Sequence, residues 1–308
     1  MQKILHLFYK NGGHMIVSAS RRTDLPAFYA DWLKKRFEEG YALVRNPMNY
    51  HQVSKVLLDL EHVEGIVFWT KNPAPLLPYL HCFKAYPFYF QYTLTPYGKD
   101  IEPGIPQKGR EGIAAFRQLS ERVGKERVIW RYDPIFLSQH YSLEYHARSF
   151  EQIAKRLEGY TEKCVFSFHD LYPSIKKRMS QSGILPMEQW QMQELAGKLA
   201  EIAAAYHLKL ETCAEKIELS QFGIRHGSCI DAALLSRIAG KSIQAKKDKS
   251  QREGCGCAAS VDIGAYGACY GGCQYCYARR DGQAKAHRAD SPFLLGGLAE
   301  GDIVRERK

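Results

Sequence analysis

Short apolar runs alternate with longer amphipathic stretches along most of the chain. Seven runs rich in Val, Ile, Phe and Tyr predict strands, at Ile16–Ser20, Ala42–Arg45, Gly65–Thr70, Phe88–Leu94, Val128–Tyr132, Cys164–Phe168 and Leu208–Thr212. Most of these runs are nearly continuous in apolar residues, which is typical of strands that are buried on both faces of a parallel sheet.

Helical patterns fit the intervals between these strands. The first helix is expected to begin after the capping residue Asp24, with Pro26 in its first turn, and to end at Gly40. Other helices are predicted over Lys108–Val123, Leu143–Leu157 and Met187–Tyr206. This alternation predicts an α/β fold, and seven strands in this rhythm favour a partial or full (β/α) TIM-type barrel over a doubly wound sheet.

The pattern predicts three parts of the chain. Residues 1–14 form an N-terminal extension before the first strand pattern, and residues 15–240 form the β/α barrel. Residues 241–308 begin with a stretch rich in Lys, Gly and Ser and continue into a C-terminal segment and tail. The change in composition near residue 241 is the reason for placing a boundary there.

Polar side chains follow the predicted strands, and in a barrel these strand ends converge on one mouth. Arg45–Pro47 follows the second strand, for example. The candidates for a site are Arg21, Arg22 and Asp24 after the first strand, Lys71 after the third, and Arg131 with Asp133 after the fifth. An ion pair that closes a strand–helix turn explains any one of them equally well. Their repetition at successive strand ends favours a site for an anion or a carboxylate.

Composition narrows the class of protein. The 308 residues are 45% hydrophobic and 25% charged, as in a soluble globular protein, and no apolar stretch reaches membrane-spanning length. The start has no signal-peptide pattern, so we expect a cytoplasmic protein without a membrane partner. The net charge of +10 allows a nucleic-acid partner without demonstrating one. Lys176–Arg178 and Lys246–Arg252 are the candidate phosphate contacts, although such clusters are more often solvated surface.

The distribution of the nine cysteines points to a metal. Disulfides are rare in a reducing compartment, and seven of the nine cysteines lie in the last third of the chain. Cys269, Cys273 and Cys276 are spaced C-x3-C-x2-C. A 4Fe-4S cluster usually has four cysteine ligands, so three thiolates would leave one iron open to a substrate or cofactor.

The cysteine spacing resembles the signature of the radical S-adenosylmethionine (SAM) superfamily. The segment "DIGAYGACYGGCQYCYARR" is similar to the cluster segment of its spore photoproduct lyase and DNA-repair-photolyase-like branch. The segments "SASRRTD", "FWTKNPAPLLPYL" and "YTLTPYGKDIEPGIPQKGREGIAAFRQL" resemble other parts of that branch. In ordinary members the cysteines come first, whereas here they come last. As a whole, the chain resembles an uncharacterised bacterial family with a radical-SAM-like cysteine cluster at its C-terminus.

The resemblance implies a circularly permuted barrel with its C-terminal iron–sulfur segment packed at the mouth. It also implies a radical SAM enzyme, in which a 4Fe-4S cluster reductively cleaves SAM and the resulting radical abstracts hydrogen from a substrate. That substrate is unknown, with nucleic acid as one candidate, and a flavodoxin or ferredoxin would supply the electron. The implied cofactor-binding residues are Tyr275, Tyr277, Tyr92, Thr93 and Arg131, and the implied catalytic or anchoring residues are Arg21, Arg22, Asp24, Lys71 and Asp133.

Several alternatives stay open at this point. The remaining clustered cysteines, Cys213, Cys229, Cys255 and Cys257, are enough to ligate a second 4Fe-4S cluster fully, or some of them are ordinary buried thiols. A zinc site could instead combine Cys255 and Cys257 with Cys273 and Cys276, although C-x-C is poor zinc spacing. A non-catalytic iron–sulfur sensor or electron carrier is the competing class of function.

Overall fold

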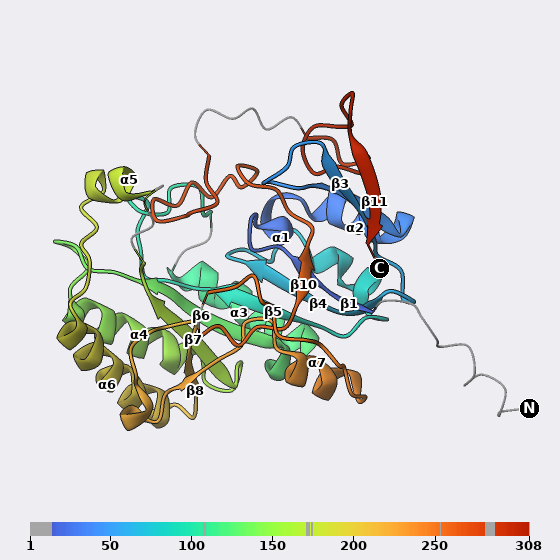
Figure 1. The fold of residues 1–308 in the computed structure, drawn as a ribbon. Helices are drawn as coiled ribbons and strands as arrows, with labels where there is room; N and C mark the ends of the chain where they lie inside the picture. Colours follow the sequence, from blue (N-terminus) through green and yellow to red (C-terminus); the bar gives the residue numbers. More distant parts are fainter. Residues whose placement is uncertain are drawn as a thin grey trace, which may run out of the picture.

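A computed structural model describes residues 14–106, 109–170, 173, 175–252, 254–280 and 287–307. Of the predicted N-terminal extension, residues 1–13 lie outside the described residues. Eight strands form one sheet in which every neighbouring pair is parallel (Figure 1). In spatial order they are β10 (Ser260–Asp262), β1 (Met15–Ala19), β4 (Val63–Thr70), β5 (Phe88–Thr93), β6 (Val128–Ile135), β7 (Lys163–Phe168), β8 (Lys209–Thr212) and β9 (Arg225–His226).

The order of strands in this sheet does not follow the chain at one edge. Strand β10 comes from the last sixth of the sequence, yet it pairs with β1, with Ile16 opposite Ser260 and Ser18 opposite Asp262. Within the described residues, β10 and β9 are the two edges and no ladder joins them. The fold is therefore an α/β fold with an open parallel sheet, and a closed TIM barrel is not confirmed.

A second, three-stranded sheet corrects one placement made from the sequence. Strand β2 (Tyr41–Arg45) was expected in the main sheet but pairs antiparallel with β3 (Gln52–Leu57), which in turn pairs parallel with β11 (Ile303–Arg307). Arg45 lies 2.7 Å from Asp302 and stacks over Tyr50. Arg45, at the end of the second predicted strand, therefore binds the C-terminal tail and does not lie at the strand ends of the main sheet.

The helices agree with the predicted pattern. They are α1 (Leu25–Phe28), α2 (Ala30–Glu39), α3 (Gly109–Val123), α4 (Leu143–Leu157), α5 (Lys176–Gln181), α6 (Gln189–Ala205) and α7 (Ala232–Ala239), with short 3-10 turns at Leu77–Phe83, Lys125–Arg127 and Ser220–Phe222. The first predicted helix is divided at Tyr29 into α1 and α2. As expected, Asp24 caps it by accepting from the Ala27 amide at 3.0 Å, and Gly40 ends it with φ of 77°.

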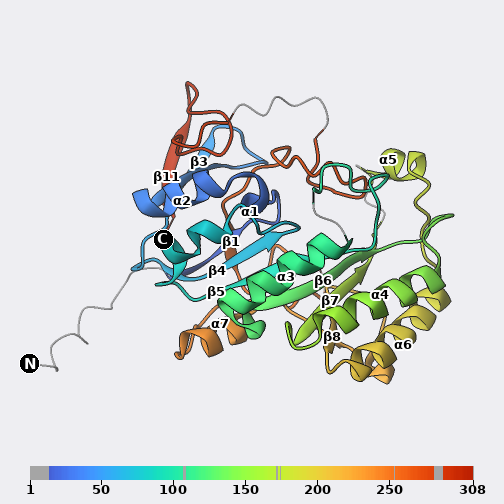
Figure 2. The ribbon, with the colours of Figure 1, turned by 180° about the vertical axis from the view of Figure 1, so that it is seen from behind.

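The two faces of the main sheet have different coverings. Helices α2, α3, α4 and α6 pack their apolar sides into one core with one face, and Figure 2 shows α3, α4 and α6 in front of it. The opposite face, called the inner face below, is covered by α7 and the segment that leads to β10. One row of side chains across this face is apolar and consists of Ile16, Val67, Tyr89, Ile129 and Val165. Two residues further along these strands the buried side chains become polar, at Ser18, Gln91, Arg131 and Ser167.

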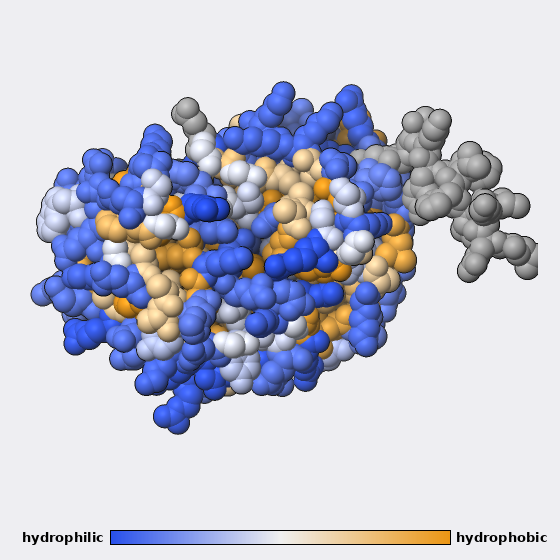
Figure 3. All heavy atoms as spheres, turned by 90° about the horizontal axis from the view of Figure 1, so that it is seen from below, coloured by the Kyte–Doolittle hydropathy of each residue, from blue (hydrophilic) through white to orange (hydrophobic). Residues whose placement is uncertain are grey.

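The outer surface is largely hydrophilic. Figure 3 views the molecule from below, and apolar side chains gather mainly in the central part of that face, between hydrophilic ones. None of the helices in the described parts of the chain is long and apolar enough to cross a membrane.

Candidate functional site: two cysteine groups on the inner face

The loop that follows β10 carries Cys269, Cys273 and Cys276 and is called the cysteine loop (residues 268–280). It lies against the loop that follows β5. The Gly104 amide donates to the Gly271 carbonyl at 3.0 Å, and the Gln274 amide donates to the Ile101 carbonyl at 2.9 Å. The C-terminal segment therefore packs at the carboxyl edge of the parallel strands, where sites of α/β proteins form.

Two glycines make this packing possible. A Cβ atom on Gly104 would overlap the carbonyl oxygen of Tyr270, so only glycine allows the two loops to approach this closely. A Cβ on Gly271 would lie 3.3 Å from the Cys269 sulfur and 3.6 Å from the Cys273 sulfur. Gly271 thus leaves a space that both thiols border.

A buried ionic network ties the cysteine loop to the strand ends. Glu102 is 1% exposed and accepts from the Lys71 Nζ at 2.9 Å and from Thr95 at 2.8 Å. The hydroxyl of Tyr275 donates to the same carboxylate. Lys71 Nζ also lies 5.7 Å from the centre of the Tyr275 ring. Burial lowers the pKa of Lys71, and the charges of Cys273 and Cys276 oppose this shift. Glu102 was not among the residues predicted from the sequence.

Asp24, which follows strand β1, also lies beside the cysteine loop. Its carboxylate accepts from the Lys71 amide at 2.7 Å, and burial raises the pKa of Asp24 to about 6. Burial also raises the pKa of Cys269 to about 11, with a further contribution from Asp24. Asp24 and Lys71, both predicted from the sequence, therefore lie beside the cysteine loop.

Side chains from β7 and α5 hold the carbonyl groups of the cysteine loop. Arg178 donates to Gln274 O at 2.7 Å and to Cys276 O at 2.6 Å. Arg178 belongs to a cluster that was considered for phosphate contact, but it supports this loop instead. His169 Nε2 lies 3.3 Å from Tyr275 O, and within the part of the chain that the structure describes its buried Nδ1 has no hydrogen-bond partner.

The other four clustered cysteines also come together. Cys213 follows β8, Cys229 follows β9, and Cys255 and Cys257 precede β10. The sulfurs of Cys229 and Cys213 are 3.1 Å apart, and the Cys257 sulfur accepts from the amide of Ile230, the residue after Cys229, at 3.4 Å. None of the nine cysteines, all of which are described, forms a disulfide.

Arg131 and Asp133 lie between the two cysteine groups. Arg131 donates to the Cys229 sulfur at 2.9 Å and to Asp133 at 2.5 Å, and Ser167 also donates to Asp133. Burial would raise the pKa of Asp133, but Arg131, Ser167 and Lys71 together outweigh it and the pKa is lowered. The charge of Asp133 acts on both Lys71 and Cys213, so the pair is adjacent to both groups.

Arg21, Arg22 and Tyr277 join β1 to the C-terminal segment. Arg21 lies 3.9 Å from Asp248, and Arg22 lies 3.9 Å from Asp262. The Tyr277 hydroxyl donates to Arg21 O at 3.3 Å. These contacts give the two arginines a role in fastening that segment, which the sequence pattern did not distinguish from a catalytic role.

The two predicted residues on β5 differ in placement. Tyr92 stacks on Phe116 and donates to Gly112 O at 3.0 Å, so it lies under α3 on the helix-covered face. The structure does not bring it to the cysteines. Thr93 is opposite Arg131 in the β5–β6 register, and it lies two residues beyond Gln91, on the same inner face.

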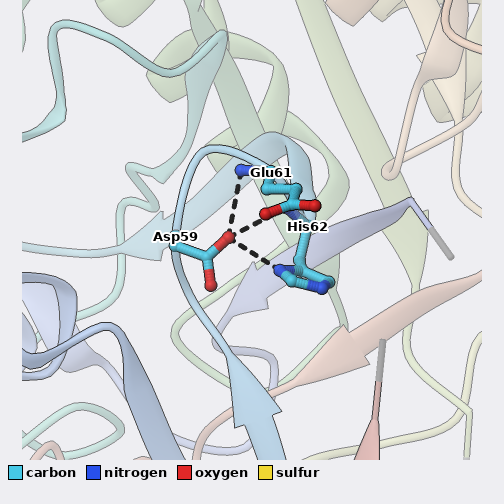
Figure 4. A group of neighbouring side chains, drawn as sticks. All are labelled: Asp59, Glu61 and His62. Atoms are coloured by element: carbon cyan, nitrogen blue, oxygen red, sulfur yellow. Dashed lines mark hydrogen bonds and ion pairs between the residues drawn. The ribbon is translucent and has the colours of Figure 1, made fainter. Parts of the chain in front are cut away.

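A further group of metal-ligating side chains occurs elsewhere. Among the described residues, only Asp59, Glu61 and His62 place three ligand atoms of His, Cys, Asp or Glu within 4.8 Å of one another (Figure 4). Asp59 accepts from the Glu61 amide at 3.0 Å and lies 2.7 Å from His62 Nδ1. These contacts cap the turn between β3 and β4, away from the carboxyl edge. The predicted zinc set, Cys255, Cys257, Cys273 and Cys276, does not form such a compact group.

Comparison with known proteins gives a family without a known activity. No curated protein matches the chain. A solved structure from Bacteroides thetaiotaomicron, assigned as an alpha-L-fucosidase, aligns over 76% of this chain and 85% of its own at 11% identity. Its TM-score of 0.29 is too low to support an inference about fold or activity. A family model matches residues 16–278, and the chain therefore belongs to the family described as a domain of unknown function, DUF1848.

Proposed function

We propose that this protein is a radical SAM enzyme whose catalytic 4Fe-4S cluster is held by Cys269, Cys273 and Cys276. The observation that carries the proposal is the seat of the cysteine loop at the carboxyl edge of a parallel sheet, where the sulfurs of Cys269 and Cys273 border the space left by Gly271. The donor set fits the group, because cysteine thiolates are the usual protein ligands of such clusters.

The order of elements in space supports the same proposal. Strand β10 lies beside β1 at one edge of the sheet, and the cysteine loop follows β10 directly. In the sequence, however, β1 comes near the start of the described chain and β10 near its end. In the superfamily that the sequence resembles, the cysteines follow the first strand of a partial TIM-type barrel. We therefore propose that the sheet is a circularly permuted form of that barrel.

When bound, the cluster and SAM would supply reductive cleavage and hydrogen abstraction. The chain itself would orient and enclose the site. Lys71, Glu102 and Tyr275 fix the cysteine loop through the buried carboxylate, and Lys71 places a cation beside the thiolates. His169, beside Tyr275, offers a ring nitrogen that no described residue bonds. The substrate class, with nucleic acid as one candidate, a flavodoxin or ferredoxin donor and a cytoplasmic location remain parts of this proposal.

The test is an anaerobic reconstitution with iron and sulfide, followed by SAM and dithionite. Iron per chain, the electron paramagnetic resonance (EPR) spectrum and 5′-deoxyadenosine are measured for the wild type and for Cys273→Ala. Cys82→Ala, a change at a cysteine outside both groups, is the matched control. We expect the nucleoside from the wild type and the control only. Bound iron without 5′-deoxyadenosine would overturn the proposal of an enzyme and favour an iron–sulfur sensor or electron carrier. Bound zinc in place of iron would overturn the proposal that these cysteines hold a 4Fe-4S cluster.

A further inference from the structure

We propose that Cys213, Cys229, Cys255 and Cys257 bind a second 4Fe-4S cluster, with all four irons ligated by the protein. These cysteines come from three separate segments, after β8, after β9 and before β10. They share one buried apolar cluster with the inner-face residues Ile16, Val67, Tyr89, Ile129 and Val165. Four thiols from such distant segments meet without forming a disulfide, which is the arrangement that a thiolate-bound metal requires.

The four thiols lie in one region of the inner face. The sulfurs of Cys213 and Cys229 are 3.1 Å apart, and Cys229, Cys255 and Cys257 belong to one buried cluster against which Cys213 packs. Cys229 is 3% exposed and Cys257 is 2% exposed. The site is therefore dry enough to protect a cluster, and its ligands are already gathered.

Donors directed at sulfur supply an independent observation. Arg131 donates to the Cys229 sulfur at 2.9 Å, and the Ile230 amide donates to the Cys257 sulfur at 3.4 Å. Trp69 packs against the same cluster, with Arg131 5.1 Å from its ring, and the buried Trp69 Nε1 has no hydrogen-bond partner among the described residues. Hydrogen bonds to sulfur and a nearby cation stabilise anionic iron–sulfur clusters, and a cluster would give Trp69 an acceptor.

The spacing favours a cubane over zinc. A tetrahedral zinc with Zn–S bonds of about 2.3 Å holds every pair of sulfurs about 3.8 Å apart. No three of these described thiols lie within 4.8 Å of one another. In a cubane each thiolate binds a different iron, so the sulfurs are spread more widely. The absence of a compact set of three thiols suits that wider arrangement, and the sulfurs of Cys213 and Cys229, 3.1 Å apart, would separate as each binds its own iron.

This site is independent of the three-cysteine site, and the test separates the two. The triple variant Cys269→Ala, Cys273→Ala and Cys276→Ala removes the first ligand set and leaves the second. After anaerobic reconstitution we expect about eight irons per chain in the wild type and about four in the triple variant. The triple variant should keep the EPR signal of one reduced 4Fe-4S cluster.

Further variants complete the test. Adding Cys229→Ser to the triple variant should abolish iron binding, whereas adding Cys82→Ser should not. Circular dichroism identifies any variant that has failed to fold. A folded triple variant without iron, with zinc, or with a Cys213–Cys229 disulfide in its peptide mass map would overturn the proposal. Four irons in the triple variant with no 5′-deoxyadenosine from the wild type would sustain this site while rejecting the proposed enzyme.

Discussion

Arg131 is a buried guanidinium, 5% exposed, that serves two partners. One end donates to the Cys229 sulfur and the other to Asp133. If the second cluster is present, this cation stabilises its more negative, reduced form. Arg131→Gln should therefore make the reduction potential of that cluster more negative and leave iron per chain unchanged. A potentiometric EPR titration in the triple cysteine variant measures the shift.

Arg117, a half-buried arginine on α3 that donates to the Arg156 carbonyl, provides the control for this prediction. Arg117→Gln should leave the potential where it was. An unchanged potential in folded Arg131→Gln would mean that the guanidinium does not act on the cluster.

His146 predicts a pH dependence of stability that is separate from the cysteines. Its Nε2 lies 2.8 Å from Phe136 O, a pure acceptor, so this nitrogen carries the proton and Nδ1 accepts from Tyr132 at 3.0 Å. Burial lowers the pKa of His146 to about 4. Between pH 4 and 6.5 the unfolded chain is protonated here and the folded chain is not, so stability falls as the pH falls.

The expected size follows from the shift. His146 accounts for a loss of up to about 3 kcal/mol from pH 7 to pH 4. In urea titrations, the stability advantage of wild type over His146→Gln should shrink across this range. His140→Gln, at an exposed position, should parallel the wild type. Parallel curves for His146→Gln and wild type would show that His146 is already charged or exposed.

At this scale the sequence singled out candidate ligands more readily than the residues that support them. Spacing marked the cysteines as candidates, and strand ends marked Asp24, Lys71 and Asp133. Glu102 was not chosen, and Arg178 was named only within a candidate phosphate-contact cluster, because nothing local shows that their partners, Tyr275 and Gln274, lie about a hundred or more residues away. The missed signal was the Glu-Pro-Gly run at 102–104, where a glycine beside an acidic residue indicated close approach.

The contact between two loops sets the position of the cysteine loop. Gly104→Ala would push a Cβ into Tyr270 O and would disturb the Gly104–Gly271 hydrogen bond. Overpacking of this kind lowers the free energy of unfolding by about 1–3 kcal/mol. The cysteine loop can relieve the overlap by moving away from residue 104. We expect iron at the first site to be lost several-fold faster to a chelator, and 5′-deoxyadenosine formation to fall with it.

A matched glycine tests whether the effect is local. Nothing lies within 4 Å of a Cβ built on Gly297, so Gly297→Ala should behave as wild type. If the second cluster exists, its iron should also survive Gly104→Ala. Equal chelator rates in Gly104→Ala and Gly297→Ala would mean that the loops are not packed in this way.

Element prediction succeeded where the pattern was long. Helix α4 has the predicted bounds Leu143–Leu157, and six of the seven predicted strands lie in the main sheet. Strands β9 and β10 span two and three residues, too few to show periodicity. Strand β3, QVSKVL, has polar residues at 52, 54 and 55 and so no regular alternation, and it pairs with the distant β11 in a separate sheet.

The arrangement of the whole molecule depends on β10 reaching the edge beside β1. Three residue pairs join these strands, and Asp262 accepts from Ser18, Ser20 and the Arg21 amide at 2.9, 2.5 and 2.8 Å. Pairing across more than 240 residues leaves no local trace, and the resemblance implied only that the C-terminal segment packs at the mouth of a permuted barrel. If the fold is permuted, the same contacts should form when the chain is opened at an exposed loop instead of at its present ends.

A circular permutant tests this directly. Arg307 pairs with Val56, and the Met15 amide donates to His62 O at 2.9 Å, so six residues of chain separate the two anchoring points. A flexible linker of roughly ten residues can therefore join 307 to 15. New ends at Gly240 and Lys241 are exposed and follow the end of α7. The product places β10 and the cysteine loop before β1, and it should match the native protein in iron content and 5′-deoxyadenosine formation.

A permutant opened between Phe90 and Gln91, inside the buried strand β5, should not fold. If the first permutant folds by circular dichroism yet binds no iron, β10 does not dock beside β1 on its own, and the permuted-barrel interpretation fails.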